Sequence, residues 1–262
     1  MTNERERKRP VAFITGAARG IGQAIAFALA EAGFDVVVND RSADSADAAD
    51  TLAGIASRGS KAIYAGGDIA DLAAHEGLVD AAFAAFGTVD CLVNNAGVPV
   101  LSPVDVLESS LASYDDCLDT NLRGPFFLTQ RVARRMAVNS GNGSYRSVIF
   151  IGSIRSEVVS TNRAEYCISK AGVSMMAKIF AVRLAEIGIA VYEVRPGIIR
   201  TAQTAGSAAR FEAMFAEKRF PQPRWGEPAE VGKVAALLAT GQLPYSVGQV
   251  VHVDGGLNIQ VL

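Results

Sequence analysis

The sequence predicts an α/β fold, in which one doubly wound parallel sheet of seven strands carries helices on both faces. Short apolar runs alternate with longer amphipathic, Ala-rich stretches along almost the whole chain. The runs are continuously apolar rather than alternating, which is typical of parallel strands covered on both faces. The length of 262 residues suits one α/β domain. Strand–helix repetition with right-handed crossovers therefore favours a single sheet.

The seven strands are expected over residues 11–14, 36–38, 61–65, 91–93, 147–151, 189–194 and 249–253. Helices long enough for crossovers are expected between them, for example over 22–32, 71–86 and 164–187. The polar, Gly-containing segment 139–144 predicts a turn. Residues 202–225 form the longest segment without a predicted strand, and a loop of that length often acts as a lid.

The domain organisation is expected to be simple. Residues 1–9 hold one basic cluster diluted by acidic residues, which predicts a flexible, solvated tail. No linker, fixed-period repeat or low-complexity stretch divides residues 10–262, so these predict a single domain.

The composition excludes several functional classes. Lys and Arg number 25 and Asp and Glu number 27, so the net charge of −2 lacks the basic excess of a nucleic-acid-binding protein. No apolar run approaches the roughly 18 to 20 residues of a membrane span, and the charged N-terminus is unlike a signal peptide. There are only two histidines, and the three cysteines form no CxxC pair. We therefore expect a soluble, cytoplasmic protein with no metal, membrane or nucleic-acid partner.

The first chemical motif directly follows the first predicted strand. The sequence TGAARGIG at 15–22 supplies Gly16, Gly20 and Gly22 and precedes an amphipathic helix. Glycines at a strand–helix turn let backbone N–H groups approach a pyrophosphate at the helix N-terminus, where the helix dipole favours anions. The alternative is a merely structural turn, but the position of the motif favours nucleotide binding.

Asp40 follows the second predicted strand closely and indicates the choice of nucleotide. An acidic residue about 20 residues after the glycines can bond an adenosine ribose and repel a 2′-phosphate. Arg19 and Arg41 have the opposite tendency, since either guanidinium could clamp a 2′-phosphate. An Arg side chain that can turn into solvent stabilises a 2′-phosphate by less than the Asp40 carboxylate destabilises it. We therefore expect NAD as the cofactor, with NADP as the alternative. A helix-capping or loop role for Asp40 is the other interpretation, and Asp68 could equally cap a helix or bond the adenine amino group.

The second chemical motif combines Ser153, after the fifth predicted strand, with Tyr166 and Lys170 in the next helix. Four residues apart, Tyr166 and Lys170 share one helix face. A free phenol has a pKa near 10, and a nearby ammonium is expected to lower the pKa of Tyr166 and make it a usable general acid/base. A serine hydroxyl aimed at the same carbonyl would stabilise oxyanion character. The alternative is that Tyr166 is a half-buried helix residue and Lys170 a solvated one.

With these motifs in this order, the chain resembles the short-chain dehydrogenase/reductase family. The matching motifs are TGxxxGxG at 15–22, Asn-Asn-Ala-Gly at 94–97, Ser153, the Tyr166-x-x-x-Lys170 pair and Pro-Gly at 196–197. The resemblance runs from about residue 9 to residue 257. It implies a Rossmann-type catalytic domain that binds NAD(P) and transfers a hydride between the nicotinamide and a secondary alcohol or ketone.

The resemblance also implies roles for single residues. Asn121 would join Lys170 through a water in a proton relay, Asn94 would support the sheet, and Thr201 would bond the nicotinamide carboxamide. The expected catalytic set is Asn121, Ser153, Tyr166 and Lys170. The expected cofactor-binding set is Gly16, Arg19, Gly20, Ile21, Gly22, Asp40, Arg41, Asp68, Ile69, Asn95, Ala96, Gly97, Tyr166, Lys170, Pro196, Gly197, Ile199 and Thr201. A homotetramer is implied as well, built through the helices that bear Asn121 and Tyr166 and through the C-terminal strand.

The substrate is less defined than the reaction. Residues 202–225 carry an apolar-aromatic set that could close over a ligand or, equally, anchor the loop. Arg155, Glu157, Asn162 and Arg163 place polar groups near the catalytic serine and tyrosine, which suggests a polar, small-molecule carbonyl or alcohol substrate. One alternative function is an NADPH-dependent 3-oxoacyl-[acyl-carrier-protein] reductase, against which Asp40 argues. A more distant alternative is a non-catalytic NAD-sensing module, which would not need an intact Ser–Tyr–Lys set.

Overall fold

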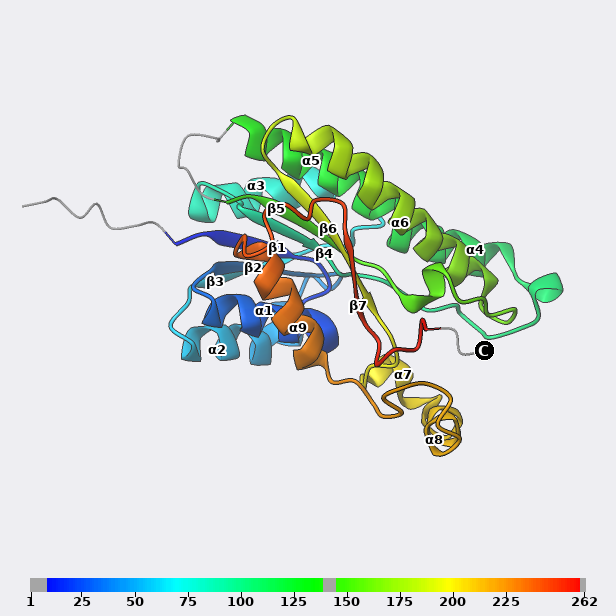
Figure 1. Ribbon diagram of the computed structural model, residues 1–262. Helices are drawn as coiled ribbons and strands as arrows, with labels where there is room; N and C mark the ends of the chain where they lie inside the picture. The colour runs from blue at the N-terminus through cyan, green and yellow to red at the C-terminus, as the bar shows by residue number, and fades with distance from the viewer. Residues whose placement is uncertain (1–8, 139–144, 260–262) are drawn as a thin grey trace, which may run out of the picture.

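Parallel strands form one seven-stranded sheet in the computed structural model, which describes residues 9–138 and 145–259 (Figure 1). Its order is β3-β2-β1-β4-β5-β6-β7, and every pair is parallel. The strands are β1 (Val11–Ile14), β2 (Asp35–Asp40), β3 (Ala62–Gly66), β4 (Cys91–Asn94), β5 (Ser147–Ile151), β6 (Ala190–Pro196) and β7 (Val250–Val253). This architecture confirms the predicted fold class.

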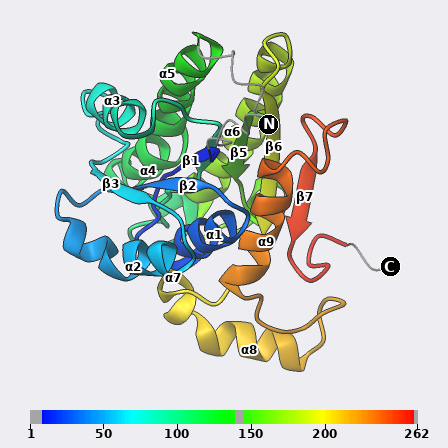
Figure 2. The same ribbon diagram turned by 90° about the vertical axis from the view of Figure 1, so that its left-hand side faces the viewer.

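Helices cover both faces of the sheet. On one face lie α1 (Gly20–Glu31), α2 (Ala49–Ser57) and α9 (Pro228–Ala239), and on the other lie α3 (His75–Phe86), α5 (Gly124–Val138) and α6 (Ala164–Ala185), as Figures 1 and 2 show. The remaining helices are α4 (Leu111–Leu118), α7 (Ala202–Ala205) and α8 (Ala208–Ala216).

The two-sided burial explains the continuously apolar strands. Along β1, Phe13 packs into the core under α3, α5 and α6, whereas Ala12 and Ile14 pack into the core under α1, α2 and α9. Successive strand residues point to opposite faces, so a strand between two helical layers is apolar at every position.

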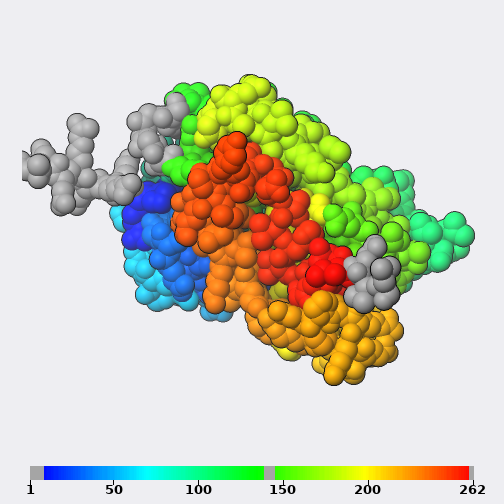
Figure 3. All heavy atoms as spheres, in the orientation of Figure 1, coloured from blue at the N-terminus to red at the C-terminus, as the bar shows by residue number. Residues whose placement is uncertain are grey.

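The segment 202–225 folds around its own aromatic side chains. Trp225 meets Phe211 and Phe215 edge-to-face, with ring centroids 5.5 and 5.6 Å apart, and Phe220 packs on Phe215. Ile198, just after β6, joins the same cluster. The aromatic residues therefore anchor the segment to the chain after β6, and closure over a ligand stays a prediction. Figure 3 shows the segment, in gold to orange, as a lobe on the body of the protein.

The N-terminal boundary differs in one detail from the expected tail. Arg9 donates hydrogen bonds to the carbonyl oxygens of Gly33 and Gly59, at 3.1 and 2.9 Å, and to Ser60 Oγ at 2.6 Å. Its guanidinium therefore ties the start of β1 to two turns. Residues 1–8 and the predicted turn at 139–144 lie outside the described residues.

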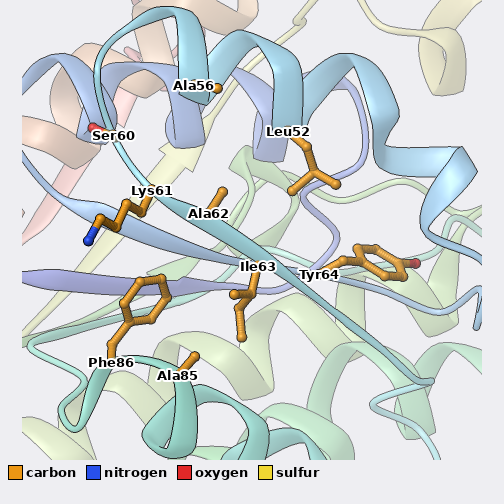
Figure 4. A pocket seen from close by; sticks show the side chains of 9 residues that line it. All are labelled: Leu52, Ala56, Ser60, Lys61, Ala62, Ile63, Tyr64, Ala85 and Phe86. Atoms are coloured by element: carbon orange, nitrogen blue, oxygen red, sulfur yellow. The ribbon is translucent and has the colours of Figure 1, made fainter.

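The open edge of β3 holds a surface hollow of about 540 Å³ between α2 and α3. Figure 4 shows its lining residues, with Phe86 from the end of α3 beside Ile63 of the strand. The exposed Lys61 stands at the start of this edge, where a charge discourages pairing with another strand. The hollow lies along the strand edge rather than at the end where ligands of this fold class bind.

Candidate active site

The strand order fixes where the candidate site lies. The chain steps from β1 outward to β2 and β3, and then returns to place β4 on the other side of β1. Ligands of such sheets bind beyond the carboxyl ends of the strands at this reversal. The loops after β1, β4, β5 and β6 carry the glycine motif, Asn95, Ser153 and Gly197, so the fold brings the predicted motifs to one edge of the sheet.

The glycine motif forms a turn without room for side chains. Gly16 and Gly20 have φ of 63° and 61°, in the left-handed region that favours glycine. A Cβ on Gly22 would lie 2.1 Å from the Gly16 carbonyl oxygen and 2.5 Å from Asn95 Nδ2. Asn95 Nδ2 donates to the carbonyl oxygens of Thr15 and Gly16 at 2.9 and 3.0 Å. The loop after β4 therefore holds the glycine turn in place.

This turn fits the phosphates of a dinucleotide. Helix α1 begins at Gly20 with Arg19 as its N-cap, and no side chain bonds its first N–H groups. The first turn of α1 holds no acidic residue. A Cβ on Gly20 would meet only Thr201 Cγ2, at 3.8 Å. Free N–H groups and the positive end of the helix dipole suit an anion.

Asp40 is held beside the glycine turn. Its Oδ2 accepts the N–H of Ala18 at 3.3 Å, and its Oδ1 accepts the N–H of Arg41 at 2.8 Å. Within residues 9–138 and 145–259, the exposed Arg19 and Arg41 form no ion pair. A half-buried, tethered carboxylate and two solvated guanidiniums match the arrangement expected for an NAD site.

Asn39 is a residue that the sequence analysis missed. Its Nδ2 donates to the carbonyl oxygens of Ala65 and Gly67 at 2.8 and 3.0 Å, and its own carbonyl oxygen accepts the N–H of Ala17 at 2.8 Å. Asn39 thereby joins the ends of β2 and β3 to the glycine turn. The signal in the sequence was an Asn directly after the apolar run 36–38 and before Asp40.

Asp68 caps a turn after β3. Its Oδ1 accepts the N–H of Ala70 at 2.9 Å, in a turn that precedes the start of α3 at His75. The neighbouring Ile69 is buried, and its carbonyl oxygen bonds His75 Nε2 at 2.8 Å. The side chain of Asp68 is exposed, so this turn-capping bond leaves its second oxygen open to a ligand.

Ser153, Tyr166 and Lys170 meet beyond β5. Ser153 begins a short 3-10 turn, Ile154–Ser156, and its Oγ accepts the N–H of Arg155 at 3.1 Å. A hydrogen bond links its hydroxyl to Tyr166. Lys170 Nζ donates to the carbonyl oxygen of Ile151 at 3.0 Å and lies 5.8 Å from the ring centre of Tyr166. The predicted common helix face is therefore present.

Burial controls the pKa values of both α6 residues. Burial raises the pKa of Tyr166 above its usual value, and the hydrogen bond with Ser153 and the charge of Arg155 oppose this rise. This direction is opposite to the expected one, because the effect of burial outweighs the hydrogen bond and the positive charge that oppose it. Burial lowers the pKa of Lys170 to about 8, and the nearby Glu193 carboxylate opposes that decrease.

Asn121 lies in a π-helical turn, Asp119–Arg123, between α4 and α5. Its Oδ1 accepts the N–H of Val98 at 2.8 Å, and its Nδ2 donates to the Val98 carbonyl oxygen at 3.0 Å and to Ser169 Oγ at 3.1 Å. A Cβ on Gly97 would meet both Asn121 Oδ1 and Lys170 Nζ, at 3.1 and 3.5 Å. Such turns often occur at functional sites, and this one places the amide beside Lys170.

The loop after β6 completes the cofactor side. A Cβ on Gly197 would lie 2.6 Å from Asp254 Cα, so the chain passes close to the end of β7. Ile199 is buried and pairs with Gly226 in an isolated bridge. Thr201 begins α7 in a capping box with Thr204 and faces Gly20. The structure therefore brings together residues from all the predicted cofactor motifs.

A buried ion-pair network behind Lys170 was not foreseen. Arg195 Nε donates to Glu193 Oε1 at 2.7 Å, and Arg195 Nη2 donates to Ser174 Oγ at 2.9 Å. Arg195 Nη1 also bonds Glu157, which was expected near the substrate. Glu157 thus contacts this network instead. The Glu-x-Arg alternation on β6 could have indicated that both side chains share one face of the strand.

The described residues contain neither a metal-binding cluster nor a membrane-spanning helix. They hold no group of three or more His, Cys, Asp or Glu side chains arranged to bind a metal ion. None of their helices is long and apolar enough to cross a membrane.

Known proteins are similar to this chain in both sequence and fold. A family model described as enoyl-(acyl carrier protein) reductase matches residues 16–258. The gluconate 5-dehydrogenase of Gluconobacter oxydans is 34% identical over 253 residues, which cover 95% of each chain. A crystal structure of 3-oxoacyl-[acyl-carrier protein] reductase from Brucella melitensis in complex with NAD has a TM-score of 0.94 and 43% identity, and the match covers 98% of this chain and 100% of that one.

The chain therefore belongs to the short-chain dehydrogenase/reductase family. It is an oxidoreductase that uses NAD(P) and acts on CH–OH groups. The resemblance, the reaction class and the nicotinamide cofactor expected from the sequence are confirmed.

Proposed function

We propose that Tyr166, Ser153, Lys170 and Asn121 catalyse the interconversion of a secondary alcohol and a ketone by hydride transfer to and from a nicotinamide. The observation that carries the proposal is the meeting of Ser153, Tyr166 and Lys170 beyond β5, next to the glycine turn. When bound, NAD(P) supplies the nicotinamide carbon that accepts or donates the hydride.

The chain's own residues handle the proton and the substrate oxygen. In reduction, the hydroxyl of Tyr166 donates its proton to the carbonyl oxygen, and in oxidation the phenolate accepts it back. Ser153 holds the same oxygen and stabilises its developing charge. Lys170, charged below a pKa of about 8, favours the phenolate form of Tyr166 electrostatically. Asn121, whose amide lies beside Lys170, would join that ammonium through a water in a proton relay.

Substituting Tyr166 by Phe tests this assignment. The Phe variant keeps the ring and loses the proton donor, so kcat should fall at least about 100-fold, while NADH binding measured by fluorescence stays near wild type. Tyr245→Phe is the matched control, because the Tyr245 side chain is fully exposed and lies before β7, at the end of that strand opposite the site. Equal loss of turnover and NADH binding in the Tyr166 variant would make Tyr166 structural. Wild-type protein without turnover on any alcohol would favour the NAD-sensing alternative.

The proposal includes a preference for NAD over NADP. The tethered Asp40 carboxylate supports it, because a 2′-phosphate beside that charge would be repelled. Titration with NADH and NADPH should therefore show much tighter binding of NADH. Asp40→Asn should bind NADPH more tightly than wild type does and so reduce the difference in affinity between the two nucleotides. Tighter NADPH binding by wild type would show that Arg19 and Arg41 prevail.

The similarity to 3-oxoacyl-[acyl-carrier-protein] reductases keeps a second substrate class in the proposal. The Brucella melitensis protein of that description is in complex with NAD. NAD use therefore does not separate an acyl-thioester substrate from a polyol or sugar acid, and Asp40 no longer argues against the reductase. Parallel assays with an acetoacetyl thioester and with D-gluconate distinguish the two classes directly.

A cytoplasmic location and a homotetramer also belong to the proposal. All three cysteines are free thiols, which suits a reducing compartment. The outer face of α6 exposes Ile168, Met175, Ile179 and Val182, and edge strand β7 is only partly buried. Both features support subunit contacts through α6 and the C-terminal strand.

A further inference from the structure

The serine turn, residues 153–157, is tied to α6 and to β6 by two consecutive side chains. Ser156 Oγ donates a hydrogen bond to the carbonyl oxygen of Lys170 at 2.9 Å. The next residue, Glu157, accepts a hydrogen bond from Arg195 Nη1 through its Oε1. These two contacts therefore set where the serine turn stands relative to α6.

The same two contacts belong to a closed ring of hydrogen bonds. Ser174, four residues after Lys170 on α6, accepts a hydrogen bond from Arg195 Nη2 at 2.9 Å through its Oγ. That Oγ also lies 3.2 Å from the Lys170 carbonyl oxygen, which is the acceptor of Ser156. The ring thus runs from Glu157 through Arg195, Ser174 and Lys170 back to Ser156, and it joins the serine turn to the catalytic part of α6.

A buried ion pair forms the base of this ring. Arg195 Nε donates to Glu193 Oε1 at 2.7 Å, and the two side chains are 5% and 1% exposed. A Cβ on Gly152, directly before Ser153, would lie 2.3 Å from the same Glu193 oxygen. The ion pair therefore packs against the backbone from which Ser153 extends.

Glu157 is not needed to neutralise this ion pair. Glu193 alone compensates the charge of the buried Arg195. The Glu157 side chain is 54% exposed, and an ion pair that involves so exposed a group contributes little to stability. His252 Nε2, on β7, lies 3.7 Å from the other Glu157 oxygen. The contacts of Glu157 thus hold the serine turn against two neighbouring strands.

We propose that Glu157, held by Arg195, is a positioning residue for Ser153. This inference rests on the proposed function, in which the Ser153 hydroxyl holds the substrate oxygen. That hydroxyl stabilises developing charge only if it points to the place that the oxygen occupies in the transition state. A displacement of about 1 Å can lower a rate about 100-fold, so a side chain that fixes the serine turn acts directly on kcat.

Support of the local fold is the competing explanation for the same contacts. Under that explanation, loss of Glu157 would reduce NADH binding together with turnover, and its effect would add to the effect of losing Ser153. A positioning role predicts a lower kcat with KM and NADH binding nearly unchanged. It also predicts no further loss of kcat once the Ser153 hydroxyl is absent, because both residues act through that one group.

A double-mutant cycle of Glu157→Ala and Ser153→Ala separates the two explanations. The assay uses the acetoacetyl thioester or D-gluconate, whichever the wild-type protein turns over. Glu157→Ala should lower kcat about 10-fold, and Glu157→Gln should restore most of it, because the amide keeps an oxygen acceptor for Arg195. In the Ser153→Ala background, Glu157→Ala should change kcat by less than about twofold.

Glu31→Ala is the matched control. Glu31 is 63% exposed and pairs with Arg58 at 2.9 Å, at the end of α1 away from the glycine turn. This variant loses a similar exposed ion pair and should keep the kcat of wild type. Near-UV circular dichroism checks the folding of every variant, and Glu157→Asp, which shortens the side chain by one methylene, replaces Glu157→Ala if that variant does not fold.

Three results would overturn the positioning role. They are an unchanged kcat in Glu157→Ala, equal losses of kcat and NADH binding, and the same loss of kcat in the Ser153→Ala background as in wild type. Each leaves the proposed function in place if Ser153→Ala itself has a much lower kcat. If Ser153→Ala keeps the wild-type kcat, or if wild type turns over neither compound, the proposed function fails and the positioning role fails with it.

Discussion

Lys170 gives the candidate active site its pH dependence. Burial brings the pKa of its ammonium to about 8, and the Glu193 carboxylate behind it resists that decrease. The ammonium therefore loses its charge as the pH rises through about 8, and Tyr166 then loses its cationic support. We expect the kcat/KM of oxidation to stop rising, and that of reduction to fall, above this pH.

Substituting Glu193 by Gln should move this titration to lower pH. The change removes the negative charge that favours the ammonium, so the pKa of Lys170 falls further. On the descending limb of the reduction profile, each half unit of displacement lowers the rate by about threefold. The measurement is kcat/KM for ketone reduction from about pH 6 to about pH 10, a range that includes the expected titration of Lys170.

Glu157→Gln is the matched control for that prediction. Glu157 pairs with the same Arg195 guanidinium but is not among the charges that act on Lys170. The Glu157→Gln variant should show the descending limb of the reduction profile at the same pH as wild type. If Glu193→Gln lowers kcat/KM equally at every pH and does not shift the descending limb, Glu193 only supports the packing around Arg195.

The placement of a single residue could be predicted from the sequence where it depends on spacing along one helix or strand. Tyr166 and Lys170 share a face because they stand four apart on one helix, and the structure keeps that relation. The raised pKa of Tyr166 was not predictable, since it depends on how deeply the finished fold buries the ring. The Glu193–Arg195–Ser174 network was missed for a similar reason, because its members meet only when α6 packs on β6.

At the scale of elements, the glycine turn and α1 act as one unit with the loop after β4. Gly22 sits within α1, where a Cβ would overlap the Gly16 carbonyl oxygen and Asn95 Nδ2. Gly22→Ala should therefore push the turn away from Asn95. We expect a loss of stability of about 1 to 3 kcal/mol by chemical denaturation and at least about tenfold weaker NADH binding, as a clash at this phosphate-binding turn implies.

Gly77→Ala is the control for a helical glycine with free space. Gly77 lies in the first turn of α3, and a Cβ there would meet nothing within 4 Å. This variant should be stabilised by up to about 1 kcal/mol, because Ala is the better helix former, with NADH binding unchanged. Equal effects of both substitutions would show that helix propensity, not the close approach at Gly16, controls the Gly22 position.

The apolar runs predicted where the helices and strands lie along the chain, but they did not predict the residues at which several of them begin and end. The runs at 11–14 and 147–151 coincide with β1 and β5, because Pro10 and Thr15 bound the first run and Arg146 and Gly152 bound the second. Strand β2 extends to Asp40 beyond the apolar run, since Asn39 and Asp40 stay paired with β3. Helix α3 begins at His75 rather than at 71, because Asp71 and Asp68 cap separate turns before it. The π-helical turn at Asn121 left no periodic signal.

At the scale of the whole molecule, an apolar stripe on α6 remains outside the two cores. Ile168, Met175, Ile179 and Val182 follow one another at seven, four and three residues, so they lie on one side of this 22-residue helix. Their exposed fractions run from 50% to 75%, although the opposite side of α6 packs on the sheet. A contiguous apolar stripe of this kind marks a protein contact.

Charges on this stripe should therefore dissociate the proposed homotetramer. The double variant Met175→Lys/Val182→Lys places two ammonium groups per subunit on the stripe, and in a symmetric contact like charges would face one another. We expect smaller oligomers by light scattering during gel filtration, while each subunit keeps its fold and NADH binding, because neither side chain reaches the core. Ala53→Lys, exposed on α2 at the opposite face of the sheet, should leave the oligomer intact. If the α6 variant has the same mass as wild type and wild type is oligomeric, subunit contact runs through β7 instead, and a wild-type monomer would remove the homotetramer from the proposal.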